Sequence, residues 1–264
     1  MTEGQIALQL YTVRDLTARD MLGTLRTVAG IGYKALEFAG YGNASPEEIR
    51  QVLDETGMRA VSAHVGAAAW QEPETALQAL KTLGCEYAVV PALPKEQRGS
   101  LEDARQFAAR LNDWARLAQA QGIRFAYHNH DFEFAPLEGS SIWATLLAET
   151  EPSLVGIELD AYWAQIAGQN PIELIGRLAG RLPLLHMKDM ANTPSRDDAP
   201  LGSGVLPWGP IMAAAARAGA AWYIVEQDNP RSPIDDVATS FQYLKRHALG
   251  SSLGTAPTIS AGNY

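Results

Sequence analysis

The 264-residue sequence contains a single cysteine, Cys85, which excludes an internal disulfide bond. It contains no apolar stretch approaching the roughly 20 residues that a membrane-spanning helix needs. Its first residues show no basic region followed by an apolar run, the pattern of a secretory signal. We therefore expect a cytoplasmic protein with no membrane association.

Positive charge is scarce as well. Lys and Arg together number 21, against 30 for Asp and Glu, and the formal net charge is −9. Such a surface repels polyphosphates and anionic membranes. A dedicated nucleic-acid binder is therefore not expected.

The chain has no Pro/Gly/Ser-rich internal linker, and 47% of its residues are apolar, so it can bury one large core. We predict a single domain over residues 1–249. The last segment, 250–264, is small and polar without periodicity, which predicts a disordered tail. The sequence does not determine the oligomeric state, and a homo-oligomer is compatible with it.

Short apolar runs alternate with segments of helical period, a pattern typical of βα units around a parallel sheet. The predicted strands cover residues 5–11, 34–40, 59–65, 87–93, 124–130, 155–160, 182–188 and 222–227. Eight units in 264 residues leave about 33 residues for each, which suits a (β/α)8 TIM barrel.

Helix boundaries fall between these runs. Ser45 and Pro46 followed by Glu48 predict a capped helix start, and Gly57 predicts its end. Ser100 and Asp103 predict the start of another helix, which should run to Gly122. Further helices are expected before Gly30 and after Pro233.

Ionisable side chains occupy the ends of the predicted strands, and in a parallel barrel these ends converge on one mouth. The residues are Glu37, His64, His128, Asp160, His186 and Glu226. Four of them, His128, Asp160, His186 and Glu226, form a nitrogen and oxygen set suited to a divalent metal. We predict that these four bind the ion, because chance would scatter such residues over helices and loops too.

Other polar and aromatic residues near the strand ends are candidates for chemistry or substrate contact. Alternate residues of a strand face the same side, so His130 should face the same way as His128, and Lys188 the same way as His186. Lys188 is either a catalytic cation or an ion-pair partner of Asp189 or Glu158.

Glu37, His64, Trp163 and Trp208 are the candidate substrate-binding residues, with ordinary packing or pairing as the alternative for each. Gly202 and Gly204 predict a flexible loop over the mouth. Their spacing alone is weak evidence for phosphate binding, because it lacks the strand-then-helix context of a dinucleotide site.

Several motifs together resemble the xylose-isomerase-like sugar phosphate isomerase/epimerase superfamily. They are LQLYTVRD (8–15), YHNHDFEF (127–134), ELDAYW (158–163), HMKD (186–189), GSGVLPW (202–208) and VEQD (225–228). The resemblance covers nearly all of the chain up to about residue 249. It implies a TIM barrel that holds Mn²⁺, Mg²⁺, Co²⁺ or Zn²⁺ through residues at strand ends.

Carried over by motif, the family's Asp, His and Glu ligands fall on Asp160, His186 and Glu226. The fifth-strand position departs from the pattern, because His128 stands where many relatives have a glutamate that is also a proton-transfer group. Two carboxylates and neutral imidazoles leave the ion more Lewis acidic than three carboxylates would. Glu226, His130 and Lys188 are then the candidate catalytic residues.

The resemblance implies a sugar or keto-sugar isomerase/epimerase that takes a proton from carbon beside a carbonyl through a metal-stabilised enediolate. Mn²⁺ is the ion we favour. The alternative is a lyase or hydratase acting on 3-keto-glycosides, for which the fifth-strand histidine is the reason. Metal-assisted phosphodiester hydrolysis is disfavoured by the acidic charge, and a non-catalytic sugar-binding subunit would lack a stoichiometric metal.

Overall fold

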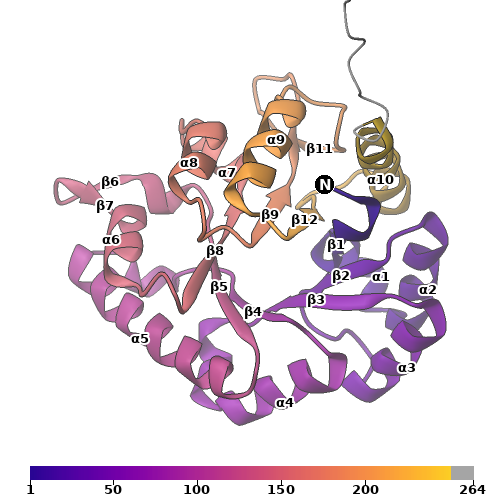
Figure 1. The fold of residues 1–264 in the computed structure, drawn as a ribbon, viewed down its shortest axis with the longest axis horizontal. Helices are drawn as coiled ribbons and strands as arrows, with labels where there is room; N and C mark the ends of the chain where they lie inside the picture. The colour runs from indigo at the N-terminus through magenta and orange to yellow at the C-terminus, as the bar shows by residue number, and fades with distance from the viewer. Residues whose placement is uncertain (251–264) are drawn as a thin grey trace, which may run out of the picture.

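Eight parallel strands close into a barrel in the computed structural model, which describes residues 1–250, without the side chains of 248–250 (Figure 1). The order around the barrel is β1-β12-β9-β8-β5-β4-β3-β2. The strands are β1 (Ile6–Gln9), β2 (Ala35–Phe38), β3 (Arg59–His64), β4 (Tyr87–Val90), β5 (Arg124–His128), β8 (Val155–Asp160), β9 (Leu184–Met187) and β12 (Trp222–Val225). The predicted TIM barrel is therefore confirmed.

Helices surround the barrel and connect successive strands (Figure 1). They are α1 (Arg14–Thr17), α2 (Met21–Ile31), α3 (Pro46–Thr56), α4 (Pro73–Leu83), α5 (Leu101–Ala120), α6 (Ile142–Glu149), α7 (Ala161–Ile166), α8 (Pro171–Arg177), α9 (Trp208–Ala218) and α10 (Pro233–Gly250). The last helix, α10, packs against α2 and β1, so the end of the described chain closes the ring beside its beginning. None of the helices within residues 1–250 has the length and apolarity to span a bilayer.

Short elements decorate the loops. Two-residue strands form the hairpins β6 (Pro136–Leu137) with β7 (Ser140–Ser141), and β10 (Asp189–Met190) with β11 (Asp198–Ala199). Short 3-10 helices are η1 (Glu3–Gln5), η2 (Leu10–Val13), η3 (Ala67–Gln71), η4 (Lys95–Gln97) and η5 (Phe132–Phe134). The predicted tail lies outside the described residues, except for Gly250 at the end of α10.

The helix ends follow the local sequence closely. The Ser45 hydroxyl accepts a hydrogen bond from the backbone N–H of Glu48, the Glu48 carboxylate accepts one from the backbone N–H of Ser45, and Gly57 ends α3 at φ 67°. Ser100 caps α5 by accepting a hydrogen bond from the backbone N–H of Asp103. The end of α2 was predicted two residues too early, because the helix continues past Gly30 to Ile31 and stops at Gly32 with φ 123°.

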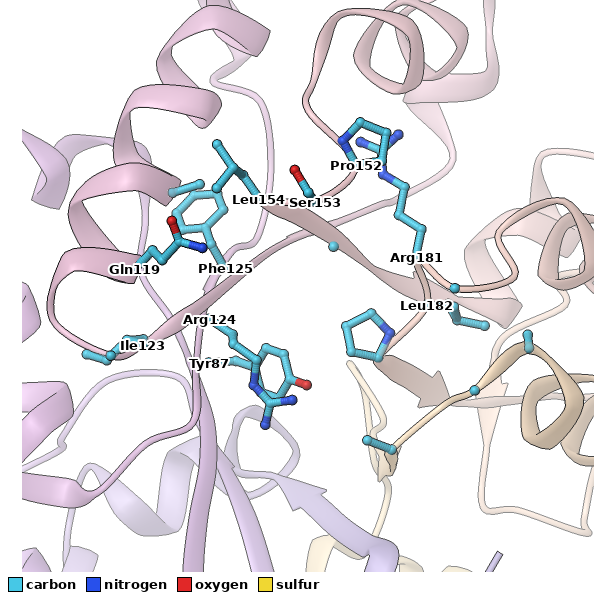
Figure 2. A pocket seen from close by; sticks show the side chains of 18 residues that line it. Tyr87, Gln119, Ile123, Arg124, Phe125, Pro152, Ser153, Leu154, Arg181 and Leu182 are labelled. Atoms are coloured by element: carbon cyan, nitrogen blue, oxygen red, sulfur yellow. The ribbon is translucent and has the colours of Figure 1, made fainter.

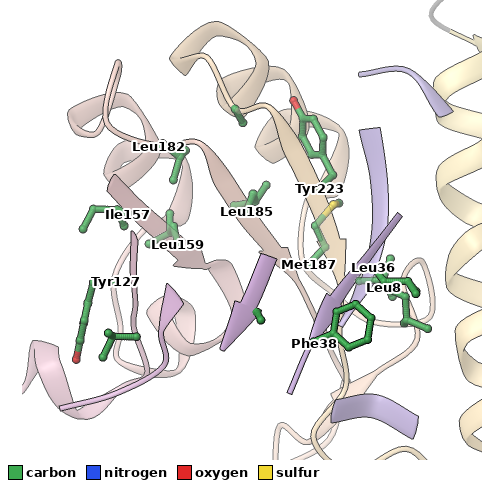
Figure 3. Packing of buried hydrophobic residues seen from close by; sticks show 14 of the residues in the cluster. Leu8, Leu36, Phe38, Tyr127, Ile157, Leu159, Leu182, Leu185, Met187 and Tyr223 are labelled. Carbon is green, nitrogen blue, oxygen red and sulfur yellow. The ribbon is translucent and has the colours of Figure 1, made fainter. Parts of the chain in front are cut away.

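The core has an outer and an inner part. Outward-facing strand residues such as Leu36, Leu159 and Met187 pack under the helices (Figure 3). A smaller inner cluster fills the barrel with side chains from successive strands, namely Ala7, Ala35, Val61, Tyr87, Val89, Ala126, Leu184, Trp222 and Ile224. The barrel interior is therefore a packed floor, and no channel is needed to explain its residues.

Candidate metal centre at the barrel mouth

A layer of polar and ionisable side chains lies directly above the apolar floor. Five strands carry an inward-facing polar side chain two residues after a residue of the inner cluster. These side chains are Gln9, Glu37, His128, His186 and Glu226, which follow Ala7, Ala35, Ala126, Leu184 and Ile224 respectively. This follows from the two-residue period of a strand. Every member of the layer is at most 5% exposed. The strands thus bury a set of charged groups that only mutual pairing or a cation can compensate.

Two groups of side chains with metal-ligating atoms form at this level of the barrel. In the first, Asp160, His186 and Glu226 each bring a ligand atom within 4.8 Å of the others. In the second, His64, His128 and Glu158 do the same with His186. The predicted set of four thus divides, with three members in one group and His128 in the adjoining group that shares His186.

The His186 ring connects the two groups. Its Nδ1 lies 3.0 Å from Glu226 Oε2, and its Nε2 lies 2.7 Å from Glu37 Oε1. The His128 ring packs 4.6 Å from the His186 ring, centroid to centroid. His128 therefore lies next to the Asp160–His186–Glu226 group even though its own nearest carboxylate is Glu158.

Lys188 places its ammonium among three carboxylates. Its Nζ lies 3.2 Å from Asp160, 3.0 Å from Glu226 and 2.7 Å from Asp228. Burial alone lowers the pKa of Lys188, but these carboxylates outweigh it and hold the pKa well above its usual value. The predicted ion-pair partners Asp189 and Glu158 are not those found.

Asp160 lies at the mouth and also stabilises the start of helix α7. Its Oδ1 accepts a hydrogen bond of 3.0 Å from the backbone of Trp163 and so caps α7. Its Oδ2 is buried and accepts no hydrogen bond from the described residues. Burial is the largest influence on the pKa of this carboxyl and raises it.

A cavity of about 630 Å³ opens above these residues. Its walls include His64, His128, His130, Trp163 and Glu226, so these predicted site residues meet at one surface. Burial, followed by the Lys188 charge, lowers the pKa of His130 to about 4. The ring of His130 lies 5.6 Å from that of Trp163, so an imidazole and an indole stand side by side in the wall.

Two predicted substrate contacts lie elsewhere. Glu37 is 0% exposed beneath His186, where Gln9 Nε2 donates to its Oε1 over 2.7 Å, so we withdraw it as a substrate contact. Trp208 was expected in a loop at the mouth. It begins α9 instead and is 1% exposed in the outer core, because its large apolar ring packs under the barrel's helices.

The glycine loop is anchored, contrary to the expectation of a flexible cover. Backbone N–H groups of Gly202 and Gly204 donate to Asp189 Oδ2 over 2.9 and 3.1 Å, and that of Leu206 donates to Oδ1 over 3.1 Å. A Cβ at Gly204 would overlap the Asp189 carboxylate and the Met190 carbonyl. The backbone donors therefore surround an internal carboxylate.

The sequence analysis assigned no metal-binding or catalytic role to two carboxylates at the mouth. Glu158 precedes Asp160 by two residues and is 0% exposed, and Asp228 follows Glu226 by two. The two-residue period of the strand places Glu158 on the same side as Asp160. Burial, partly offset by Lys188, raises the pKa of Asp228 to about 6.

The donor set fits a divalent ion. Glu37, Glu158, Asp160, Glu226 and Asp228 bring five carboxylates to one buried region, whose one lysine is Lys188. Asp160 Oδ2 pairs with the Lys188 ammonium, whereas Glu37 Oε2 and Glu158 Oε1 are buried without a hydrogen bond from the described residues. Imidazole and carboxylate ligands together suit Zn²⁺, Mn²⁺ and related ions.

The other end of the barrel holds a second cavity, of about 470 Å³ (Figure 2). Its walls include Arg124 at the start of β5, and Leu154 and Arg181, which precede β8 and β9. Arg181 donates to the Val155 and Leu147 carbonyls, and Arg124 pairs with Glu86. The guanidinium groups of this cavity are therefore engaged by the protein itself.

A closed parallel barrel with buried histidines and carboxylates at the carboxyl ends of its strands defines a TIM barrel with potential metal ligands at its mouth. The chain belongs to the xylose isomerase-like TIM barrel family, whose model matches residues 25–247.

Individual relatives are distant. The chain is 26% identical over 190 residues to an inosose dehydratase of Geobacillus kaustophilus, a match that spans 63% of this chain and 61% of that protein. The crystal structure of a sugar phosphate isomerase/epimerase from Parabacteroides distasonis superposes with a TM-score of 0.79 at 26% identity, covering 92% of this chain and 94% of that one. A zinc-bound structure of IolI protein shares the fold, with a TM-score of 0.75 at 15% identity and coverage of 96% and 100%.

Proposed function

We propose that this protein is a divalent-metal-dependent carbon–oxygen lyase that acts on a keto-sugar derivative. In this reaction a proton leaves the carbon beside the carbonyl, a carbon–carbon double bond forms, and the bond to the β-oxygen breaks. The leaving oxygen takes up a proton. A bound divalent ion would supply Lewis acidity at the substrate carbonyl.

The main support for this proposal is that carboxylates and histidines lie on opposite sides of one cavity. Glu226, with Asp228 near it, follows β12, while His64, His128 and His130 come from β3 and β5 on the opposite arc of the barrel. Elimination needs a base that takes the carbon-bound proton and an acid that protonates the leaving oxygen. We assign the first role to Glu226. For the second role we favour His64 over His130, because the lowered pKa of His130 leaves it neutral near pH 7, whereas Glu37 and Glu158 raise the pKa of His64 to about 10 against the effect of burial.

Trp163 and Lys188 complete the assignment. Trp163 offers a flat apolar face in the cavity wall, suited to the C–H face of a sugar ring. Lys188 holds Asp160, Glu226 and Asp228 together through its ammonium and orients the base without contacting the cavity's contents. The metal ligands we propose remain His128, Asp160, His186 and Glu226.

A neighbouring hollow supports a glycoside as the substrate. This hollow, of about 400 Å³, shares Gly40 and His64 with the mouth cavity, and its walls are largely apolar, with Val65, Ala69 and Ala76 among them. A free monosaccharide would leave such a surface uncovered. An apolar substituent on the leaving oxygen would cover it.

The relatives support either outcome of the shared first step. The dehydratase relative favours elimination, and the runner-up, a sugar isomerase/epimerase, is favoured by the superposition on a sugar phosphate isomerase/epimerase. Sequence patterns alone favoured the isomerase. We place elimination first because His128 occupies the position where a second proton-transfer carboxylate would be needed.

The test combines metal analysis with product analysis. The purified protein, loaded with Mn²⁺, Co²⁺ or Zn²⁺, is incubated in D₂O with 3-keto-glucose and with an aryl 3-keto-glucoside. We expect an unsaturated product and release of the aryl alcohol. Deuterium in an epimerised or isomerised sugar without elimination would support the isomerase, and absence of a stoichiometric ion after loading would overturn both.

A further inference from the structure

Next to the proposed metal ligands lies a network of two buried glutamates and the cavity-lining His64. Glu37 and Glu158 are both 0% exposed, and His64 Nε2 lies between them, 3.2 Å from Glu37 Oε1 and 2.9 Å from Glu158 Oε2. None of the three belongs to the proposed ligand set. Burying two carboxylates side by side is costly, so their presence needs an explanation.

Each glutamate contacts one ring nitrogen of a proposed ligand. Glu37 Oε1 lies 2.7 Å from His186 Nε2, and Glu158 Oε2 lies 3.0 Å from His128 Nδ1. Glu158 also approaches His186 Nε2 at 3.2 Å. A hydrogen bond to one ring nitrogen decides which nitrogen of a histidine is left to bind a metal.

For His186 the consequence is specific. A neutral ring carries one N–H, and donating it to Glu37 leaves the lone pair of Nδ1 facing Glu226 Oε2 at 3.0 Å. Two lone pairs at that distance repel unless a proton or a metal ion lies between them. On this side of the ring, Glu226 Oε2 and Asp160 Oδ2 share the ammonium of Lys188, at 3.0 and 3.2 Å.

For His128 the same reasoning selects the other nitrogen. Donation from Nδ1 to Glu158 leaves Nε2 as the free nitrogen of a ring that lines the mouth cavity. The pairing is set by the strands themselves, because His128 and Glu158 are register partners of β5 and β8.

We propose that Glu37 and Glu158 are positioning residues that fix the two histidine ligands, so that His186 binds the metal through Nδ1 and His128 through Nε2. This inference rests on the metal site of the proposed function. It also explains why a carboxylate appears at Glu158 when the fifth strand carries a histidine. Glu158, on the neighbouring strand β8, supplies a carboxylate next to the His128 ring in place of one on β5.

The first test reads the ring nitrogens directly. Long-range ¹H–¹⁵N spectra of the full-length protein, unloaded and loaded with Zn²⁺, distinguish metal-bound Nδ1 from metal-bound Nε2. We expect Nδ1 metallation for His186 and Nε2 metallation for His128. The opposite nitrogen on either ring would overturn the proposal. If the wild type binds no metal, the proposed function fails, and the unloaded spectrum still decides whether His128 carries its proton on Nδ1, as expected, or on Nε2.

The second test measures Co²⁺ affinity and stoichiometry in Glu37→Gln and Glu158→Gln. We expect one ion per chain throughout and a loss of affinity of about 10- to 100-fold in each variant, the size typical of outer-shell partners. Glu86→Gln, which removes a carboxylate at the opposite end of the barrel, is the matched control and should bind like the wild type. Unchanged affinity in both folded variants, or two ions per chain with His64 and Glu158 as ligands, would overturn the proposal.

Discussion

The two ends of the barrel hold cavities of similar size but opposite character. At the mouth, about 630 Å³ of space adjoins histidines and carboxylates whose charges are not fully matched within the protein. At the other end, about 470 Å³ adjoins arginines that already donate to backbone carbonyls or pair with Glu86 (Figure 2). Volume alone therefore does not mark the site. The cluster of buried ionisable side chains does.

The difference follows from the direction of the strands. The last inward-facing residue of each strand and the residue after it lie at the mouth, so single positions far apart in sequence combine there. The residues at the opposite end precede the strands and face helix ends and turns. Substitutions at each end should therefore have different effects on activity and stability.

Replacing Glu226 with Gln should have the largest effect. The amide keeps the size of the side chain but removes the charge near His186 and Lys188 and the proposed base. We expect loss of activity of about 10²- to 10⁴-fold on the keto-sugar substrate, with an unchanged circular dichroism spectrum. Wild-type turnover in this variant would show that the mouth does not owe its chemistry to Glu226.

Replacing Lys188 with Met leaves Asp160, Glu226 and Asp228 without their buried cation. We expect the free energy of unfolding of the metal-free protein to fall by about 3–5 kcal/mol, as when one partner of a buried ion pair is removed. Urea denaturation measures this loss. Added Zn²⁺ should restore part of it, and a metal-independent loss would mean that the ammonium and the ion do not share the same carboxylates.

Gly204→Ala tests the loop beside the mouth. The added Cβ would overlap the Asp189 carboxylate and the Met190 carbonyl, so we expect a loss of about 1–3 kcal/mol in thermal or urea unfolding. Gly209→Ala is the matched control, because a Cβ there meets nothing within 4 Å. Equal stability of the two variants would mean that the loop is not anchored as described.

Arg124→Ala, at the opposite end, should have the smallest effect. Arg124 pairs with Glu86 while 59% of its side chain is exposed, and exposed pairs contribute about 0–1 kcal/mol. We expect enzymatic activity within about twofold of wild type, since the residue does not approach the mouth. A large loss of activity would remove the contrast between the two cavities.

The sequence predicted the barrel and most of the mouth because both depend on strand periodicity. His130, Trp163 and Glu226 line the cavity as their strand-end positions suggested. The roles of Glu37 and Trp208 were mistaken, since depth below the mouth and the start of a helix depend on tertiary packing. The sequence analysis considered Glu158 only as an ion-pair partner of Lys188, and its contact with His128 required the pairing of β5 with β8.

Asp160 joins the mouth to helix α7 through one carboxyl group, since Oδ1 caps the helix at Trp163 and Oδ2 pairs with Lys188 at the proposed metal site. Any cation that draws on Oδ2 also changes the charge at the helix start, and the Trp163 indole stands in the cavity wall beside it. Trp163 is therefore an intrinsic fluorophore next to the proposed metal site. Titration of the site should be visible as a change in tryptophan emission that Trp163→Phe abolishes.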